Sequence, residues 1–323
     1  MKYLITGASG LIGGALLREL VANQHDVVAV SRHPPVGAQD VVWHKGDITK
    51  PESLAPAFSE SYDVLIHLAG LVSADGRNRE ELFAVNGQGT RNVFEWALKA
   101  KIRRCLQVSS TAAIGPAPYG RIADETTPFS WSPDKFAYHA SKHEGEKIAL
   151  EYVLKGLDVV VVNPAFVYSE KDDHTPARDL LRKIRDRRLP LYPPGGMCNV
   201  WVGDVVKGMT RAVERGRTGE RYILGGENLL HRDSYGIMAE ALGAVIPRIP
   251  VGVAALYVYA LTSEIGARLM RQKPRFCLSW ARASNHTYFY SSEKAARELA
   301  YAPLDFRSTI QRVVPAMLNA RLL

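Results

Sequence analysis

The feature that most constrains this 323-residue chain is a glycine-rich stretch close to its first residue. The sequence TGASGLIGG, residues 6 to 14, directly follows the apolar run Tyr3 to Ile5 and directly precedes a run of helix-forming residues. Glycine allows sharp turns and close backbone approach, so Gly7, Gly10 and Gly13 predict a tight strand-to-helix turn against which a pyrophosphate can lie. The free N–H groups and the dipole at the start of such a helix favour anions.

Short apolar runs recur through the first half of the chain and alternate with helical patterns. Because the runs are continuous rather than alternating, they indicate parallel strands buried on both faces. We therefore expect an α/β protein with a doubly wound parallel sheet, the Rossmann architecture. The expected strands are residues 3–5, 27–30, 41–44, 64–68, 105–108 and 159–162. The expected helices are residues 11–23, 51–59, 79–100 and 137–154.

Beyond Asn163 and Pro164 the regular alternation fades. Helical stretches joined by turns rich in Pro and Gly predict a smaller, mostly helical lobe that would bind the substrate. We expect residues 1–165 to form the Rossmann domain and residues 166–323 to form this lobe. Because residues 221–224, RYIL, have the pattern of a strand, the chain is expected to return to the sheet near 221–226. The expected helices of the lobe are residues 177–187, 205–215, 232–242, 253–270, 292–299 and 307–320.

Charge and composition exclude a nucleic-acid-binding protein. The formal net charge is +8, from 41 basic and 33 acidic residues. The densest basic clusters, residues 178–188 and 268–275, carry no interleaved aromatic side chains, and no helix-turn-helix or RNP-like motif accompanies them. We expect no nucleic-acid partner, and a solvated helix face for the first cluster.

The cysteines and the apolar segments indicate a cytoplasmic protein. The three cysteines are widely separated and lack the spacing of a metal site or disulfide framework, as expected in a reducing compartment. The first apolar run is too short for a signal peptide. The most apolar stretch, residues 249–265, is interrupted by Pro250, Gly252 and Glu264, so we expect a buried or interfacial helix and no transmembrane span. The cysteines are Cys105, Cys198 and Cys277.

The end of the second expected strand bears on which dinucleotide would bind. A glycine turn between strand and helix at the start of an alternating chain meets the condition for a dinucleotide fingerprint. Sites that prefer NAD commonly place an acid on the ribose 2′-hydroxyl, whereas an arginine accommodates the 2′-phosphate of NADP. Here Ser31 stands in place of the acid and Arg32 follows it. We expect NADP(H), with NAD(H) less favoured; the alternative is that Arg32 is an ordinary surface residue.

Two further motifs carry candidate catalytic groups. The sequence YHASK places Tyr138 and Lys142 four residues apart, on one face of a helix, where the ammonium would lower the pKa of the phenol. The sequence VSSTAAIG, residues 108–115, follows an expected central strand, at the edge where ligands bind in open α/β sheets. Taken alone, each motif has an ordinary structural alternative: a surface Tyr/Lys pair, and a Ser/Thr turn that satisfies its own backbone.

Taken together and in order, the motifs resemble the extended branch of the short-chain dehydrogenase/reductase superfamily, over nearly the whole chain. The resemblance includes dihydroflavonol 4-reductase-like and 3β-hydroxysteroid dehydrogenase-like proteins. One departure is Ala300, which stands where the family's closing segment usually has glycine. The matching motifs are TGASGLIG, GDI (46–48), HLAG (67–70), N-x-x-GT-x-N (86–92), SS before Gly115, Tyr138-xxx-Lys142, NP (163–164) and EKAARELAYAP (293–303).

The resemblance implies roles position by position. Ser110, five residues before Gly115, matches the catalytic serine, Tyr138 the general acid/base, and Lys142 the residue that lowers the pKa of the tyrosine and holds the nicotinamide ribose. Asn86 matches a position that the family keeps near the site. With the glycine turn and Arg32, the expected cofactor-binding residues are Gly7, Ser9, Gly10, Leu11, Ile12, Gly13, Arg32, Asp47, Ile48, Leu68, Ala69, Gly70, Tyr138, Lys142, Pro164, Ala165 and Val167.

The implied reaction is hydride transfer between a nicotinamide and a carbonyl or carbinol carbon. The first interpretation is an NADP(H)-dependent reductase of a ketone or aldehyde, acting on a largely hydrophobic small molecule. A nucleotide-sugar epimerase or dehydratase is the second, although Thr111 and Ala112 follow Ser110 where the dehydratases carry an Asp-Glu pair. A non-catalytic NADP sensor is the third, and such proteins typically lack the Tyr/Lys pair that this chain has.

The sequence leaves the substrate, the direction of the reaction and the oligomeric state open, with a homodimer as one option. His139 and His143 lie four residues apart but have no evident third ligand, so we expect no metal. The hydrophobic character of the substrate is inferred from aromatic residues of the second lobe. These are Tyr257, Tyr259, Phe276, Trp280 and Phe289.

Overall fold

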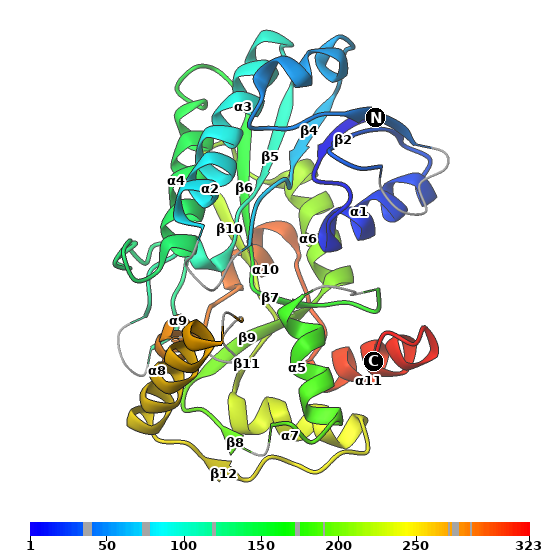
Figure 1. Cartoon of the computed structure of the whole chain (residues 1–323). Coiled ribbons are helices and arrows are strands. Elements are labelled where there is room, and N and C mark those ends of the chain that lie inside the picture. The colour runs from blue at the N-terminus through cyan, green and yellow to red at the C-terminus, as the bar shows by residue number, and fades with distance from the viewer. Residues whose placement is uncertain are drawn as a thin grey trace.

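A seven-stranded parallel sheet forms the centre of the molecule (Figure 1). The computed structural model describes residues 1–34, 41–72, 78–117, 121–171, 175–189, 191–270, 272, 278–284 and 286–323, without the side chains of residues 279 and 280. The strand order is β10-β6-β5-β4-β1-β2-β3, so the predicted doubly wound fold is confirmed. The strands are β1 (Lys2–Thr6), β2 (Asp26–Ser31), β3 (Val42–Lys45), β4 (Val64–His67), β5 (Arg104–Val108), β6 (Val159–Pro164) and β10 (Arg221–Leu224).

Helices cover both faces of this sheet, which explains the continuous apolar runs. In β1, Leu4 packs into the core under one face, whereas Tyr3 and Ile5 pack into the core under the other. On the Ile5 side lie α1 (Leu11–Ala22), α6 (Val202–Arg215) and α10 (Glu293–Leu299). On the Leu4 side lie the 3₁₀ helix η1 (Pro51–Phe58), α3 (Thr90–Lys99) and α4 (Ala137–Glu151).

The chain expected to form one helix over residues 79–100 is divided into three. Helix α2 (Arg79–Phe83) leads into a π-helical segment, η2 (Ala84–Gly89), and then into α3. The segment passes close to α4, because a Cβ on Gly145 would lie 2.2 Å from the backbone oxygen of Asn86. The extra residue per turn of the π segment sets Asn86 at this crossing, and π segments of this kind are frequent at functional sites.

The second half of the chain builds a lobe around strand β9 (Gly196–Trp201). This strand pairs with β7 (Phe166–Tyr168), β11 (Glu227–Leu230) and β13 (Thr287–Tyr288), none of which was predicted. These strands are short and lack a regular apolar period, so they give little sequence signal. The other elements are η3 (Thr111–Ala113), α5 (Pro176–Arg185), β8 (Leu191–Tyr192), α7 (His231–Ala241), β12 (Ile249–Pro250), α8 (Val253–Leu269), α9 (Leu278–Ala283) and α11 (Phe306–Asn319).

The lobe contains one large core and one small one. Helices α5, α7 and α11 enclose the large core, which includes Tyr168 and Phe306. Helices α8 and α9 share the small one, whose buried members are Leu256, Ala260 and Ala281. Within the described residues, no helix is long and apolar enough to cross a lipid bilayer.

The crossing of α4 over the π segment yields a stability prediction. Gly145→Ala is expected to lower the free energy of unfolding by about 1–3 kcal/mol, because the new methyl group must push α4 away from the Asn86 carbonyl. Gly236→Ala in α7 is the matched control. A Cβ there has no neighbour within 4 Å, so this variant should gain up to about 1 kcal/mol from helix propensity. Urea unfolding compares them, and equal responses of the two variants would contradict the assignment.

Candidate active site

The glycine turn after β1 is packed so closely that its glycines are required. Gly7 has φ +77°, and a Cβ there would lie 2.5 Å from the backbone nitrogen of Ala69. A Cβ on Gly13 would lie 2.2 Å from the carbonyl oxygen of Gly7. The turn thereby brings the ends of β1 and β4 together beneath the start of α1.

The start of α1 is open for an anion. Gly10, in extended conformation, caps the helix, and no side chain caps its first N–H groups. Ser9 and Gly10 are exposed, while Leu11 and Ile12 are half-buried. Uncapped N–H groups at an accessible helix start are the arrangement that holds a phosphate.

The described residues that end β2 and follow it, 31–34, include a cation and no carboxylate. Ser31 is buried, and its hydroxyl donates to the carbonyl of His33 at 2.5 Å and accepts from Trp43 Nε1 at 3.0 Å. Arg32, next in sequence, is exposed and acts electrostatically on Asp47. The hydroxyl of Ser31 is therefore engaged within the protein, and Arg32 is the charged group at this end of the strand.

Asp47 and Ile48 follow β3 and are held by local contacts. Burial alone would raise the pKa of Asp47, but hydrogen bonds from Thr49 and the charge of Arg32 lower it. Ile48 is buried, and its carbonyl oxygen accepts from Asn92 at 2.8 Å. Asp47 is therefore ionised beside Arg32 at this edge of the sheet.

Ser110 and Tyr138 meet at the carboxyl end of β5. Ser110 caps η3, where its hydroxyl accepts from the Ala112 N–H at 3.1 Å. Burial raises the pKa of Tyr138, and a side-chain hydrogen bond with Ser110 partly opposes this effect. The neighbouring Ser109 is buried, and its hydroxyl has no hydrogen-bond partner among the described residues. Of the two serines, Ser110 is the one that reaches the tyrosine.

Lys142 lies one turn beyond Tyr138 on α4. Its ammonium donates to the carbonyl of Val108 at 3.2 Å, and a Cβ on Gly70 would lie 3.5 Å from its Nζ. Burial lowers the pKa of Lys142 to about 8, while the charge of Glu146 acts in the opposite direction. The ammonium thus lies between the ends of β4 and β5, next to the Leu68 to Gly70 segment.

Two neighbours secure the segment that follows β4. Asn86 accepts the Leu71 N–H at 2.8 Å, returns a bond to the Leu71 carbonyl at 3.0 Å, and donates to Ser141 on α4 at 2.9 Å. His67 is fully buried between Thr6 at 2.6 Å and Thr90 at 3.2 Å. Burial, aided by the charge of Lys142, lowers the pKa of His67 to about 3, so its ring is neutral.

Glu146, Asn163 and Arg221 form a buried polar group that the sequence analysis did not identify. The Asn163 side chain donates to the Ser110 carbonyl at 3.0 Å and to Glu146 at 2.7 Å. Glu146 pairs with Arg221 at 2.9 Å, and its side chain is 3% exposed. Because Glu146 is eight residues after Tyr138 on α4, this group ties the tyrosine helix to the serine loop and to β10.

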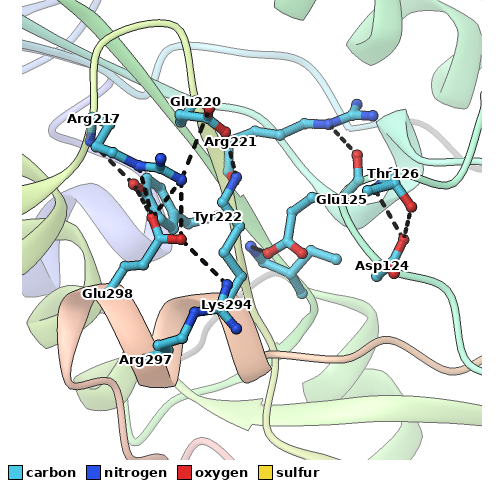
Figure 2. A network of polar contacts seen from close by, with 11 residues as sticks. Asp124, Glu125, Thr126, Arg217, Glu220, Arg221, Tyr222, Lys294, Arg297 and Glu298 are labelled. Atoms are coloured by element: carbon cyan, nitrogen blue, oxygen red, sulfur yellow. Dashed lines mark hydrogen bonds and ion pairs between the residues drawn. The ribbon is translucent and has the colours of Figure 1, made fainter.

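Arg221 also belongs to a wider network around the edge strand β10, which Figure 2 shows. Its Nε donates to the Glu125 carbonyl at 2.9 Å. Arg217 binds Glu298 through two bonds of 3.0 Å, and Lys294 binds Glu220 at 2.6 Å. A cleft of about 610 Å³ opens among these residues. The cations and anions of the network pair with one another. We infer that the network holds strand β10 in place.

Aromatic side chains from both lobes gather beside Tyr138. Trp131 lies 4.6 Å from Phe136, 4.9 Å from His139, 5.0 Å from His286 and 5.7 Å from Tyr288, measured between ring centroids. Burial lowers the pKa of His139 to about 4, aided by His286. His139 lies 5.9 Å from the ring of Tyr138, so this cluster forms an apolar wall next to the tyrosine.

The aromatic residues singled out in the sequence have other surroundings. Tyr257 packs in the small core of α8 and α9, Tyr259 is 54% exposed, and Phe289 lies against Gly196. Phe276, Cys277 and the side chain of Trp280 lie outside the described residues.

The described residues hold no group of three or more His, Cys, Asp or Glu side chains that could bind a metal. Cys105 and Cys198 are buried free thiols, and burial raises the pKa of each to about 12. Neither thiol is therefore ionised near neutral pH.

The remaining predicted cofactor residues lie where β6 ends. Pro164 is the last residue of β6, and the Ala165 N–H donates to the Leu224 carbonyl of β10 at 3.2 Å. Val167 begins to cross into the second lobe as part of β7. The structure thus collects Gly7, Gly70, Ser110, Lys142 and Pro164 at one edge of the sheet.

Comparison with known proteins establishes the family. The model of the NAD dependent epimerase/dehydratase family matches residues 3–225, and the chain belongs to this family. The predicted membership of the extended short-chain dehydrogenases/reductases is confirmed. As a member, the chain is an NAD(P)-dependent enzyme.

Individual relatives cover most or all of the chain. Sterol demethylase protein B of Methylococcus capsulatus is 31% identical over 324 residues, 97% of each protein. The 4-hydroxy-2-methyl-3-oxo-4-farnesyl-3,4-dihydroquinoline-1-oxide ketoreductase of Stigmatella aurantiaca is 33% identical over 69% of this chain and 68% of its own. The crystal structure of gox2253 is 31% identical, with a TM-score of 0.84 over 99% of both chains.

One more distant structure carries a nicotinamide cofactor. DesIV, the dTDP-glucose 4,6-dehydratase of Streptomyces venezuelae, was determined with NAD and TYD bound. It is 22% identical, with a TM-score of 0.80 over 99% of this chain and 98% of its own. This likeness concerns the fold.

The buried ammonium predicts a pH-dependent stability. The pKa of Lys142 is about 8 when folded and about 10.4 in an unfolded chain. Between these values the unfolded state binds one more proton, so the contribution of Lys142 to the free energy of unfolding rises with pH. Relative to Lys142→Met, the wild type should therefore gain up to about 1.4 kcal/mol per pH unit from pH 8 to 10.

Urea unfolding at several pH values measures this gain. Lys147→Met is the matched control, because its side chain is 57% exposed on the same helix. The free energy of unfolding of this control should change with pH as that of the wild type does. If Lys142→Met also ran parallel to the wild type from pH 8 to 10, Lys142 would not be desolvated as described.

Proposed function

We propose that the protein is an NADP(H)-dependent oxidoreductase that reduces a ketone or aldehyde of a hydrophobic small molecule, or oxidises the corresponding alcohol. The observation that carries the proposal is that Ser110 lies close enough to Tyr138 to lower the pKa of its phenol, one helical turn from Lys142. The three groups together can donate a proton to a bound substrate. The catalytic roles of these residues are part of the proposal.

In the reductive direction Tyr138 donates its proton to the substrate oxygen as negative charge develops there. Ser110 donates a hydrogen bond to the same oxygen and stabilises that charge. Burial raises the pKa of Tyr138, and an ammonium at Lys142 would favour the phenolate that results. In the oxidative direction the phenolate accepts the proton of the alcohol.

The dinucleotide supplies the hydride, or takes it up. The residues at the carboxyl ends of the strands fit such a cofactor. No side chain caps the start of α1, and the packing at Gly7 and Gly13 leaves no room for a larger residue in the turn. Gly10, Leu11 and Ile12 would hold the pyrophosphate. Lys142, beside Gly70, would hold the nicotinamide ribose, and Pro164, Ala165 and Val167 would flank the ring.

A preference for NADP(H) is supported by the end of β2. Ser31 stands where an acid would bind a ribose 2′-hydroxyl, and its own hydroxyl is engaged by His33 and Trp43. The exposed guanidinium of Arg32 would pair with a 2′-phosphate. Ionised Asp47 lies near Arg32, and it would hold the guanidinium in place from the adjacent loop.

A hydrophobic substrate is supported by the aromatic wall and by the relatives. The rings of Trp131, His139 and Tyr288 lie beside the turn of α4 that carries Tyr138. They offer an apolar surface from both lobes. Two relatives have names that refer to a sterol and to a farnesyl-substituted quinoline, both bulky and apolar. A homodimer and a cytoplasmic location remain parts of the proposal.

A nucleotide-sugar dehydratase is the second candidate, since DesIV has this fold. Thr111 and Ala112, the residues after Ser110, are buried and offer no carboxylate for eliminating water. This difference favours the reductase.

The first test of the proposal concerns Tyr138. Tyr138→Phe is expected to slow NADPH oxidation about 100-fold or more with a hydrophobic ketone, because the proton donor is lost. Binding of NADPH, measured by fluorescence, should stay within about two-fold of the wild type, since the phenol adds little ground-state affinity. Turnover is followed by the absorbance of the reduced nicotinamide, over a panel of ketones, β-keto acids, sterols and nucleotide sugars.

Tyr192→Phe is the matched control for this test, because Tyr192 lies in β8 of the second lobe. It should turn over like the wild type. Full activity of Tyr138→Phe would exclude the proposed proton transfer, and turnover confined to nucleotide sugars would favour the second candidate.

The second test concerns Arg32. Arg32→Ala is expected to weaken NADPH binding by about ten-fold or more and to leave NADH binding unchanged, because a charge-assisted bond to the 2′-phosphate is lost. Arg103→Ala is the control. This exposed residue precedes the amino end of β5, whereas Arg32 follows the carboxyl end of β2. Titration by nicotinamide fluorescence measures the six dissociation constants, those of three proteins with two cofactors. Wild-type protein that binds NADH as tightly as NADPH would refute the preference.

A further inference from the structure

Helix α8 is apolar on two opposite sides. Its inner side carries the buried residues Leu256, Ala260 and Ala267, and the first two share a small core with Ala281 of α9. A surface helix of a protein that faces only water normally turns polar residues outward. In Figure 1 this helix lies at the periphery of the second lobe, far from the central sheet.

The outer side of α8 carries a stripe of exposed apolar residues. Val258, Leu261, Ile265 and Leu269 recur every three or four residues, so they share one face of the helix. Their exposed fractions are 63%, 50%, 50% and 82%. The stripe lies opposite the buried residues, and it therefore adds nothing to the core of the lobe.

The exposed apolar surface extends beyond the helix. Ile249 in β12 is 58% exposed, and its neighbour across the strand pair, Leu191, is 39% exposed. Residues 245–270 hold eight of the 17 large apolar side chains that are exposed in the described chain. Isolated exposed apolar residues need no explanation, but such a concentration in one segment indicates a surface that another apolar phase covers.

The charges of this segment have one sign on its surface. Arg248 and Arg268 are exposed. The only acid of residues 245–270 is Glu264, which is half-buried and accepts the Leu278 N–H at 2.8 Å.

We propose that α8, with β12, docks on the surface of an anionic lipid bilayer, the helix lying in the plane of the interface. The apolar stripe would enter the boundary between headgroups and acyl chains, and the arginines would contact the anionic headgroups. At 17 residues the helix is about 25 Å long, shorter than a bilayer-spanning helix, which agrees with a position along the surface.

Charge favours the bilayer over a second copy of the chain. In a two-fold contact between α8 helices, the same surface meets itself. Arg248 and Arg268 of both copies would then meet with no exposed acid of this segment to pair with them. An anionic bilayer satisfies the apolar stripe and the arginines together. This inference does not depend on the proposed reaction.

Sedimentation with vesicles tests the proposal on the full chain. We expect binding to vesicles of phosphatidylcholine with about one third phosphatidylserine, and much weaker binding to phosphatidylcholine alone. The double variant Ile265→Glu/Leu269→Glu should need at least about ten-fold more lipid for half-maximal binding. Arg248→Gln/Arg268→Gln should lose about 25-fold in affinity for the anionic vesicles, at about five-fold for each arginine.

Leu154→Glu is the matched control, since Leu154 is 91% exposed elsewhere on the surface, and it should bind like the wild type. Circular dichroism checks that each variant is folded. Wild-type protein that stays in solution with anionic vesicles overturns the proposal, as does unaltered binding of the glutamate variant. Light scattering tests whether a second copy of the chain covers α8 instead. That would be shown by a dimeric wild type that does not bind vesicles, together with a monomeric glutamate variant.

Discussion

The ion pair of the buried Glu146 with Arg221 fixes how helix α4 lies on the sheet. Glu146 is on α4, Arg221 is on the returning strand β10, and Asn163 on β6 links the carboxylate to the Ser110 backbone. A buried pair of this kind adds little net stability, because desolvation offsets the attraction, but loss of one partner leaves an unpaired charge that costs about 3–5 kcal/mol. The pair therefore selects one register of α4 against the sheet, and the relative positions of Ser110 and Tyr138 depend on that register.

The same arrangement tunes the ammonium at the site. Lys142 lies one turn from Glu146, and the carboxylate opposes part of the fall in pKa that burial causes. Without it the ammonium would lose its proton at a lower pH. Glu146 thus acts on its surroundings by two routes, through hydrogen bonds with Asn163 and through its charge on Lys142. The protein keeps a desolvated cation in the site at a cost to its own stability.

The sequence predicts the parts of this structure that have a local signal. The strands of the central sheet were predicted because most of them are short apolar runs bounded by turn residues, and the glycine turn because its three glycines are regularly spaced between a strand and a helix. The group of Glu146, Asn163 and Arg221 was not predicted, because 75 residues separate the ion-pair partners and neither has a distinctive local pattern. The π segment was missed for a related reason. Gly145, against which its Asn86 backbone packs, lies on another helix.

Helix α8 shows the limit of composition as a guide. Its sequence reads as a buried or interfacial helix, and burial in a large core would have used both of its apolar sides. The fold provides only a small core, with Leu256, Ala260 and Ala281 as its buried members, so one side is left outside. An apolar residue contributes to stability only through the area it buries, and each side chain of the outer stripe leaves half or more of its surface exposed. The hydrophobic free energy of that stripe is therefore still available for contact with another apolar phase.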